Sequence, residues 1–400
     1  MAILITRALL SVPVLAGSIL FGSAAVAAPG QNCAEPGRAQ INGSYARAML
    51  QADEINSIEN GAGTTVAVLA TGVDAGQPLL GNRVLGGTDV DDNAGRADQD
   101  CVGLGTQVAG TISGRGTGVS PAARVLPIRV MPDDPAGTEP TPGSLARGIT
   151  TAVQNGADVI VVTVPVLTDQ AVLSTAVATA VAQDVTIVAA VGERDRDEDP
   201  DVIPYPAGYR GVIGVAAIDG NGQILDTART GTFVDLVAPG VAVPTLQTGR
   251  GFVDADGTAI AAGLTGASAA LLRARDPGLT VAEVAARLEA TASPTAFTAG
   301  AVNPYAALTA RIVDSGARQL PALTPPAVPA QSAEQQRRVI AVTSAILTAI
   351  LVPAVLLVAA ALRRSSRRQW RPGLAARPHT PDEPLEPGPP VMLLDTPVRP

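Results

Sequence analysis

The stretch from Asp256 to Gly263 reads DGTAIAAG, and it decides how the rest of this 400-residue sequence is interpreted. Alone it is a weak signal, because strings of alanine and glycine are expected by chance in a chain as rich in these residues as this one. Its meaning comes from further stretches upstream, which share one pattern with it and stand in a fixed order.

Four upstream stretches belong to the same pattern, and three of them contain an apolar run that predicts a strand. Residues 66–73 read VAVLATGV, and an apolar run of this length bounded by Thr-Gly predicts a buried parallel strand. Residues 103–110 read GLGTQVAG, and residues 118–130 read GVSPAARVLPIRV, a helix exit followed by another core strand. Residues 187–193 read IVAAVGE, the end of a further strand.

These stretches together resemble the subtilisin-like serine proteases, the subtilases. Their motifs VAVIDTGV, GHGTxVAG and GTSxAxP carry the catalytic Asp, His and Ser in that chain order, one of several orders that give the same triad geometry. The resemblance covers roughly residues 61–310. It implies an α/β fold, a subtilisin-like parallel sheet flanked by helices on both faces. Apolar strands that alternate with Ala-rich helical stretches indicate the same architecture.

Every catalytic position of the resemblance is occupied by a residue without the required chemistry. The Asp position is Ala70, the His position is Leu104 and the Ser position is Ala259. The Asn that donates a hydrogen bond to the oxyanion is replaced by Glu193, whose carboxylate would repel a developing negative charge. The resemblance therefore transfers no catalytic role to this chain, and we expect neither a cofactor nor a metal site.

Other residues could in principle replace the missing groups. A serine nucleophile needs a base, and the base needs a third group that orients it. The one histidine, His379, lies beyond a predicted membrane span. We interpret the remaining candidates as turn caps, solvated loop residues or helix-packing hydroxyls; they are Asp74, Asp100, Asp256, Thr258 and Ser268.

The edge that would bind a substrate is also altered. Residues 158–165, DVIVVTVP, stand where the family has a strand whose backbone pairs with an extended peptide. Pro165 has no N–H group to donate, so we expect a weakened cleft.

The ends of the chain predict export and a membrane anchor. An apolar run followed by Ala-Val-Ala indicates a signal peptide, and a run of 24 uncharged residues suffices to span a bilayer. Arginines follow this run at once, so the positive-inside rule places the C-terminus in the cytoplasm and the large domain outside. The predicted segments are a signal peptide (1–27), an N-terminal extension (28–60), a subtilisin-like domain (61–318), a Pro-rich linker (319–338), a transmembrane helix (339–362) and a cytoplasmic tail (363–400).

Export also determines how the cysteines and charges are interpreted. In an oxidising compartment Cys33 and Cys101 are expected to form one disulfide; the alternative is two free buried thiols. The formal net charge is −8, and the tail and leader are basic, which leaves about −12 for the exported part. Such a body does not favour nucleic acid as a partner. Acidic loops at 89–100 and 193–201 lack a calcium-ligand spacing, and we interpret them as solvated.

This layout is similar to that of the mycosins, the membrane-anchored subtilases of actinobacterial type VII secretion systems, and Asp100-Cys101 ahead of GLGTQVAG fits that family. Departures are the triad and oxyanion positions and the lack of the further cysteines that mycosins usually carry. The resemblance implies a pseudoprotease that is a structural or binding component of a type VII secretion membrane complex. Two alternatives stay open: an atypical serine-type endopeptidase that uses unidentified residues, and a decoy that binds peptides without cutting them.

Overall fold

The structure is a computed structural model that describes residues 33–41, 43–91, 95–134, 139–195, 198–199, 202–310 and 333–367. The predicted signal peptide and nearly all of the predicted tail lie outside these residues, as do the first part of the extension and most of the linker. By its contacts the chain divides into two compact units, Met1–Asp314 and Ser315–Pro400, which are described separately.

The first unit is built on an eight-stranded sheet in which every pair of neighbouring strands is parallel. Its order is β10-β7-β6-β5-β4-β1-β3-β2. The expected fold class is confirmed. The strands are β1 (Thr65–Ala70), β2 (Thr88–Asp89), β3 (Arg124–Arg129), β4 (Val159–Val162), β5 (Thr186–Ala190), β6 (Val212–Ile218), β7 (Leu236–Pro239) and β10 (Gly300–Ala301).

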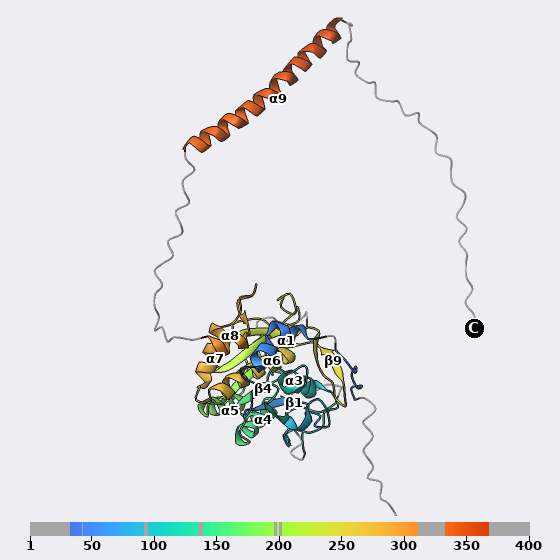
Figure 1. Cartoon of the computed structure of the whole chain (residues 1–400), viewed down its shortest axis with the longest axis vertical. Helices are drawn as coiled ribbons and strands as arrows, with labels where there is room; N and C mark the ends of the chain where they lie inside the picture. The colour runs from blue at the N-terminus through green and yellow to red at the C-terminus, as the bar shows by residue number, and fades with distance from the viewer. Residues whose placement is uncertain are drawn as a thin grey trace, which may run out of the picture. The chain divides into compact units, whose positions relative to one another are not determined.

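Helices cover both faces of this sheet (Figure 1). Alternate residues of β1 show the two layers: Val66 and Val68 belong to one hydrophobic cluster, whereas Ala67 and Leu69 belong to the other. Such double burial is why the strands read as continuous apolar runs. The first cluster packs α1 (Tyr45–Met49), α2 (Ala52–Asn56), α3 (Leu104–Ser113), α6 (Thr258–Arg275), α7 (Val281–Ala290) and α8 (Pro304–Thr309); the second packs α4 (Pro142–Gln154) and α5 (Ala171–Ala182).

Helix α6 is the central helix of the first cluster, and it is buried from Thr258 to Arg273. Its small residues are required by close packing. A Cβ atom added at Gly263 would lie 2.4 Å from Thr111 Oγ1 on α3, and one added at Gly266 would lie 2.3 Å from Val161 Cγ2 on β4. The small residues of DGTAIAAG and its continuation therefore let one helix lie directly against the sheet and against α3.

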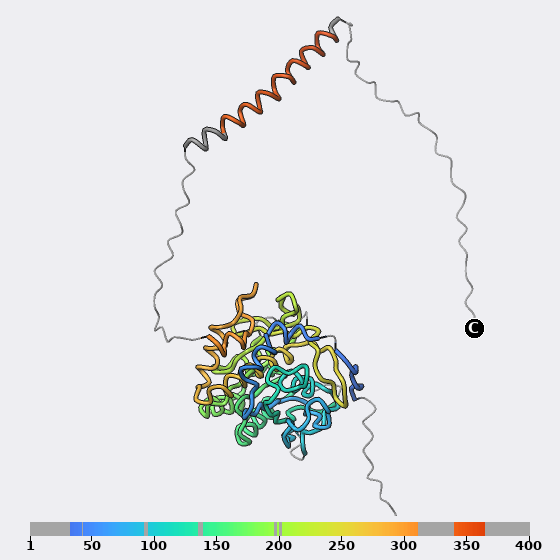
Figure 2. The backbone as a smooth tube through the Cα atoms, viewed as in Figure 1, coloured from blue at the N-terminus to red at the C-terminus, as the bar shows by residue number. Residues whose placement is uncertain are grey.

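The N-terminal part of the described chain crosses the surface beside a second, two-stranded antiparallel sheet, β8 (Val243–Leu246) and β9 (Phe252–Ala255). The amide of Arg38 donates to the carbonyl of Phe252, and the amide of Phe252 donates back to Arg38, both at 2.8 Å. A disulfide joins Cys33 to Cys101. Figure 2 shows this blue segment running along the yellow hairpin.

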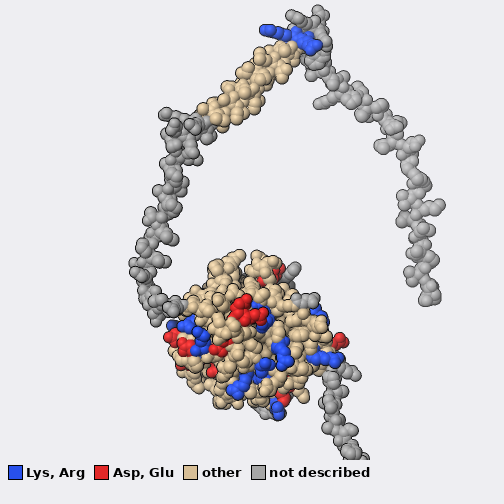
Figure 3. Space-filling view, viewed as in Figure 1, with Lys and Arg blue, Asp and Glu red and all other residues tan. Residues whose placement is uncertain are grey.

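The second unit contains the long helix α9 (Ala333–Arg367). Its residues Ile340–Arg364 form a candidate membrane span by length and composition, with mean hydropathy 2.7. Figure 3 shows this helix free of charged side chains along its apolar part, with basic side chains at its C-terminal end. Pro353 lies inside it, which membrane helices tolerate.

Candidate functional site

The three positions that the subtilase resemblance assigns to a triad lie together at the carboxyl edge of the sheet. Ala70 is the last residue of β1, Leu104 the first of α3 and Ala259 the second of α6. Ala70 and Ala259 belong to one buried hydrophobic cluster, and Leu104 packs against it. The three side chains carry only hydrocarbon, so this part of the site has neither a nucleophile nor a base.

Glu193, at the fourth position, binds the start of α6. Its Oε1 accepts a hydrogen bond from the amide of Thr258 at 2.6 Å, and the Thr258 hydroxyl accepts one from the amide of Gly192 at 3.0 Å. Gly257, the residue before the helix, has φ +120°, and a Cβ there would lie 3.1 Å from Glu193 Oε1. A carboxylate at this point satisfies an otherwise unpaired amide and complements the positive end of the helix dipole.

A carboxylate also accepts hydrogen bonds from the N-terminal residues of helix α3. Asp100 accepts hydrogen bonds from the amide and hydroxyl of Thr106 at 2.7 and 2.6 Å, and from the amide of Gly103 and the hydroxyl of Thr71 at 2.8 Å each. Burial raises the pKa of the Asp100 carboxyl, while these hydrogen bonds lower it. Asp100 therefore ties the turn after β1 to the start of α3.

The other candidate stand-ins are also engaged by backbone groups. Asp74 accepts from the amide of Gly249 at 2.6 Å, and Asp256 accepts from the amide of Ala242 at 2.7 Å. Ser268 is fully buried and donates to the carbonyl of Leu264 at 2.8 Å, one turn back along α6. None of these side chains is positioned as a nucleophile with an adjacent base.

Directly after the stretch 158–165, whose counterpart in the family pairs with a substrate, the chain pairs with itself at Val166. The amide of Val166 donates to the carbonyl of Tyr205, and the amide of Tyr205 donates to Val166, both at 2.8 Å. The ring of Pro165 lies so close to Gly192 that a Cβ added there would be 2.7 Å from Pro165 Cγ. The sequence analysis singled out Pro165 but did not predict that the next residue, Val166, pairs with Tyr205.

No resident metal site is evident in the part of the chain that the structure describes, where no three His, Cys, Asp or Glu side chains cluster closely enough to hold an ion. In the first acidic loop, Asp89 pairs with Arg129 at 3.0 Å, and Arg129 also binds the carbonyls of Thr71 and Gln99. This arginine links the loops that surround the turn after β1.

The comparisons with known proteins agree with this architecture. Residues 61–323, well over half of the chain, match the Subtilase family, so the chain belongs to the subtilase family. Subtilisin E of Bacillus subtilis is 30% identical over 238 residues, which cover 58% of this chain and 61% of subtilisin E. Subtilisin DY of Bacillus licheniformis is 30% identical over 256 residues, which cover 62% of this chain and 91% of the relative. The chain thus spans less than two thirds of the length of subtilisin E.

Among solved structures, the chain resembles type VII secretion subtilases. MycP1 with its N-terminal propeptide removed gives a TM-score of 0.61 at 31% identity, with 68% of this chain and 100% of that chain covered. MycP1 from Mycobacterium smegmatis gives 0.60 at 29%, covering 71% and 90%. The MycP3 protease of the type VII (ESX-3) system gives 0.58 at 29%, covering 70% and 93%. MycP1 itself is described as a serine protease and an essential component of the ESX-1 system.

Proposed function

We propose that this subtilase is a pseudoprotease, a non-catalytic, membrane-anchored component of a type VII secretion membrane complex. One observation carries the proposal: the catalytic edge of the sheet holds Ala70, Leu104 and Ala259, and the Glu193 carboxylate binds the first amide of α6. This observation supports the proposal because the chain has the subtilase fold but carries other residues at the positions that match the family's catalytic groups.

The expected loss of turnover is large. Removing a subtilase triad costs about a millionfold in kcat. Removing one oxyanion donor costs about a hundred- to a thousandfold, and these factors do not multiply. Glu193 goes further than removing a donor, since it places a carboxylate at the N-terminus of α6, beside the position that would carry the nucleophile. The loss of the triad is the larger of the two changes, and at most a residual rate about a thousand- to ten-thousandfold above the uncatalysed reaction would survive it.

The substrate edge supports a role other than cleavage. A substrate strand needs free backbone groups at the edge it joins. Val166 uses both of its backbone groups on Tyr205, and Pro165 has no N–H. Pro165 offers no donor and its neighbour Val166 is already paired, so the peptide-binding decoy is less favoured than a structural component.

The anchor and the relatives support the proposed location. Ile340–Arg364 is long and apolar enough to cross a membrane, and basic residues follow its apolar part. The positive-inside rule then places the C-terminal tail in the cytoplasm and the subtilase body on the other side. Because MycP1 and MycP3 belong to type VII secretion systems, we infer partners among the membrane subunits of such a system.

Active-site labelling with a fluorophosphonate tests the catalytic part of the proposal. The full chain in detergent should remain unlabelled while an active subtilisin, treated in parallel, is labelled. A variant carrying Ala70→Asp, Leu104→His, Ala259→Ser and Glu193→Asn is the matched control, because it restores the family's residues on this scaffold. Stoichiometric labelling of the unmodified chain at a serine would contradict the proposal and support the atypical peptidase.

The location and partner parts need a second experiment. The chain should co-purify with type VII secretion membrane subunits from detergent extracts of its own organism. Absence of these subunits under conditions that keep the secretion complex intact would refute this part while leaving the catalytic part standing. Saturable peptide binding that is lost on substitution of Leu104 or Glu193 would instead support the decoy.

A further inference from the structure

The N-terminal segment, residues 33–41, pairs with a strand edge that is otherwise free. Strand β9 pairs with β8 on one side, and in the described part of the chain the backbone pairing on its other side is with this segment. The amide of Arg38 donates to the carbonyl of Phe252 and the amide of Phe252 donates back, both at 2.8 Å. The amide of Gly37 donates to the carbonyl of Arg250, also at 2.8 Å. The segment therefore adds a short third strand to the hairpin (Figure 2).

The geometry of this edge restricts which residues can lie against it. A Cβ atom at Gly37 would lie 2.3 Å from the carbonyl oxygen of Phe252, so the close approach of the two backbones requires glycine. The next residue, Arg38, forms an ion pair with Asp254 of β9 at 2.6 Å. The edge thus fits an extended segment in which glycine precedes arginine.

Apart from its disulfide, the N-terminal segment is held weakly. None of residues 33–41 is buried, so the segment gains little from the burial of apolar surface. The side chains of Arg38 and Asp254 are 60% and 43% exposed, and exposed ion pairs contribute little to stability. The disulfide from Cys33 to Cys101 is the covalent attachment on the N-terminal side of the paired residues. Its loss would leave a few backbone hydrogen bonds as the main contacts.

This disulfide can be opened only by a reductant from outside the chain. The chain has two cysteines and both are in the bond, so no further thiol of its own can exchange with it. Both residues are partly exposed, which allows a thiolate to attack one sulfur. An external dithiol would form a mixed disulfide with one cysteine and release the other as a thiol. Its second thiol would then displace the remaining cysteine, so that two electrons pass from the dithiol to Cys33 and Cys101.

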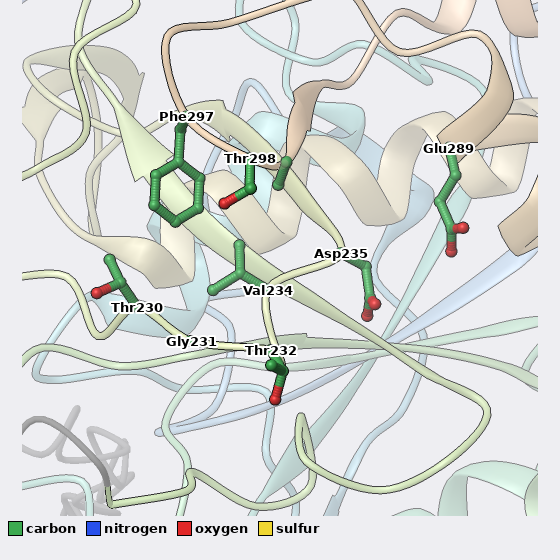
Figure 4. Close-up of a pocket in the computed structure, with 9 residues that line it drawn as sticks. Thr230, Gly231, Thr232, Val234, Asp235, Glu289, Phe297 and Thr298 are labelled. Carbon is green, nitrogen blue, oxygen red and sulfur yellow. The ribbon is translucent and has the colours of Figure 1, made fainter.

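Two hollows of the body, by contrast, do not indicate what would fill them. In the hollow of about 620 Å³ beside the start of β7, the carboxylates of Asp235 and Glu289 are not directed toward the ring of Phe297 (Figure 4). The hollow of about 640 Å³ on α5 is lined by small, uncharged side chains such as Thr175 and Ala178. The edge of β9 does show which kind of segment it accepts, because one lies there.

We propose that the free edge of β9 is a docking site for an extended segment of a partner protein in which glycine precedes arginine. While the disulfide is formed, the chain's own N-terminal segment occupies this edge. Reduction of Cys33–Cys101 by a dithiol loosens that segment, and the partner then replaces it by strand addition. The proposal involves none of the degenerate catalytic positions, so it is independent of the pseudoprotease assignment.

Hydrogen exchange of the unmodified full chain in detergent tests the redox step. After treatment with dithiothreitol, the amides of Arg38 and Phe252 should exchange at least about tenfold faster, because the segment that pairs them has lost its covalent attachment. The amide of Val161 in the central strand β4 should be unchanged, which shows that the body stays folded. Equal protection of Arg38 and Phe252 with and without dithiothreitol would overturn the redox control. An equal rise at Val161 would also contradict it, since reduction would then loosen the whole body.

A fluorescent peptide with the sequence of residues 34–41, AEPGRAQI, tests the docking edge. A chain that begins at Ile41 and carries Cys101→Ser lacks the competing segment, and it should bind this peptide saturably with or without dithiothreitol. The full chain should bind it at least about tenfold more tightly when reduced than when oxidised. Peptides with Gly37→Val or Arg38→Glu should bind at least about tenfold more weakly than the parent peptide. No saturable binding to the shortened chain while β4 remains protected, or equal binding of the three peptides, would overturn the proposal.

A variant of β9 locates the contact. Asp254→Asn should remove most of the preference for the parent peptide over the Arg38→Glu peptide, whereas Asp226→Asn, an exposed carboxylate outside β9, should leave the preference unchanged. An unchanged preference in the Asp254→Asn chain would contradict the assigned edge. Dimerisation of the reduced chain without peptide, measured by light scattering, would show that a second copy occupies the edge and would contradict the proposed partner.

Discussion

Glu193 shows how one substitution changes the role of a position. An amide side chain there could donate a hydrogen bond to an oxyanion, whereas an ionised carboxylate can only accept hydrogen bonds. In this chain the carboxylate accepts a hydrogen bond from the amide of Thr258, so it stabilises the start of α6 and is not free to contact a substrate.

Glu193→Ala should lower the free energy of unfolding by about 1 kcal/mol, because it leaves the amide of Thr258 without this acceptor and removes a negative charge from the helix N-terminus. Urea denaturation at neutral pH measures the effect, with Asp226→Ala as an exposed control. Equal stability of the variant and the unmodified chain would show that the contact does not contribute.

Asp235 is the residue at which a pH dependence should be measurable. Because its pKa is raised by burial, its contribution to stability is present at low pH and is lost as the pH rises through the raised value. Asp235→Asn should therefore be more stable than the unmodified chain near pH 7, and the difference should shrink towards about pH 4.

Asp219→Asn is the control, because the expected pH dependence of stability at this residue has the opposite sign. Hydrogen bonds from the Gln223 and Asn221 amides lower the pKa of Asp219, so its contribution is present at neutral pH and is lost on acidification. Denaturation curves from pH 4 to 7 compare the two variants. If the stability change caused by each substitution varied with pH in the same direction, the assigned directions of the two pKa shifts would be contradicted.

Among the elements, helix α6 can pack closely against α3 and the sheet because its residues at these contacts have very small side chains. Gly263→Ala would place a Cβ 2.4 Å from Thr111 Oγ1 and 3.1 Å from Val108 Cγ1, both on α3. We expect a loss of about 1–3 kcal/mol from overpacking, measured by chemical denaturation.

Gly143→Ala on α4 is the matched control, because the added Cβ would meet nothing closer than 3.5 Å, the Arg147 guanidinium. If the two variants are equally stable, α6 does not depend on the close contact with α3.

We expect the position of the N-terminal segment to depend on its disulfide. Cys33 and Cys101 are 68 residues apart, and closing a loop of this length restricts the unfolded chain. Replacing both cysteines by serine should lower the unfolding free energy by about 2–4 kcal/mol and release the Arg38–Phe252 pairing to faster hydrogen exchange. Unchanged exchange at these amides would show that the strand pairing alone holds the segment.

At the scale of the whole molecule, a subtilase body and an apolar helix form separate units of one chain. Truncation before Ile340 should move the protein from the membrane pellet to the soluble fraction, because about 20 apolar residues anchor a chain and α9 supplies them. A truncation after Arg367 is the control, since it keeps the helix and removes only the tail. Membrane retention of the shorter form would place the anchor elsewhere.

The sequence predicted a parallel sheet with helices on both faces, because continuous apolar runs alternate with Ala-rich stretches, and the resemblance to the subtilases identified the particular fold. It also determined which atoms are absent at Ala70, Leu104 and Ala259, since hydrocarbon side chains cannot transfer a proton in any fold. Two contacts could be found only in the folded structure: Glu193 accepts a hydrogen bond from the amide of Thr258, and Val166 pairs with Tyr205 beside Pro165. These contacts join residues tens of positions apart through loops, whose paths depend on packing and leave no periodic signal in the sequence.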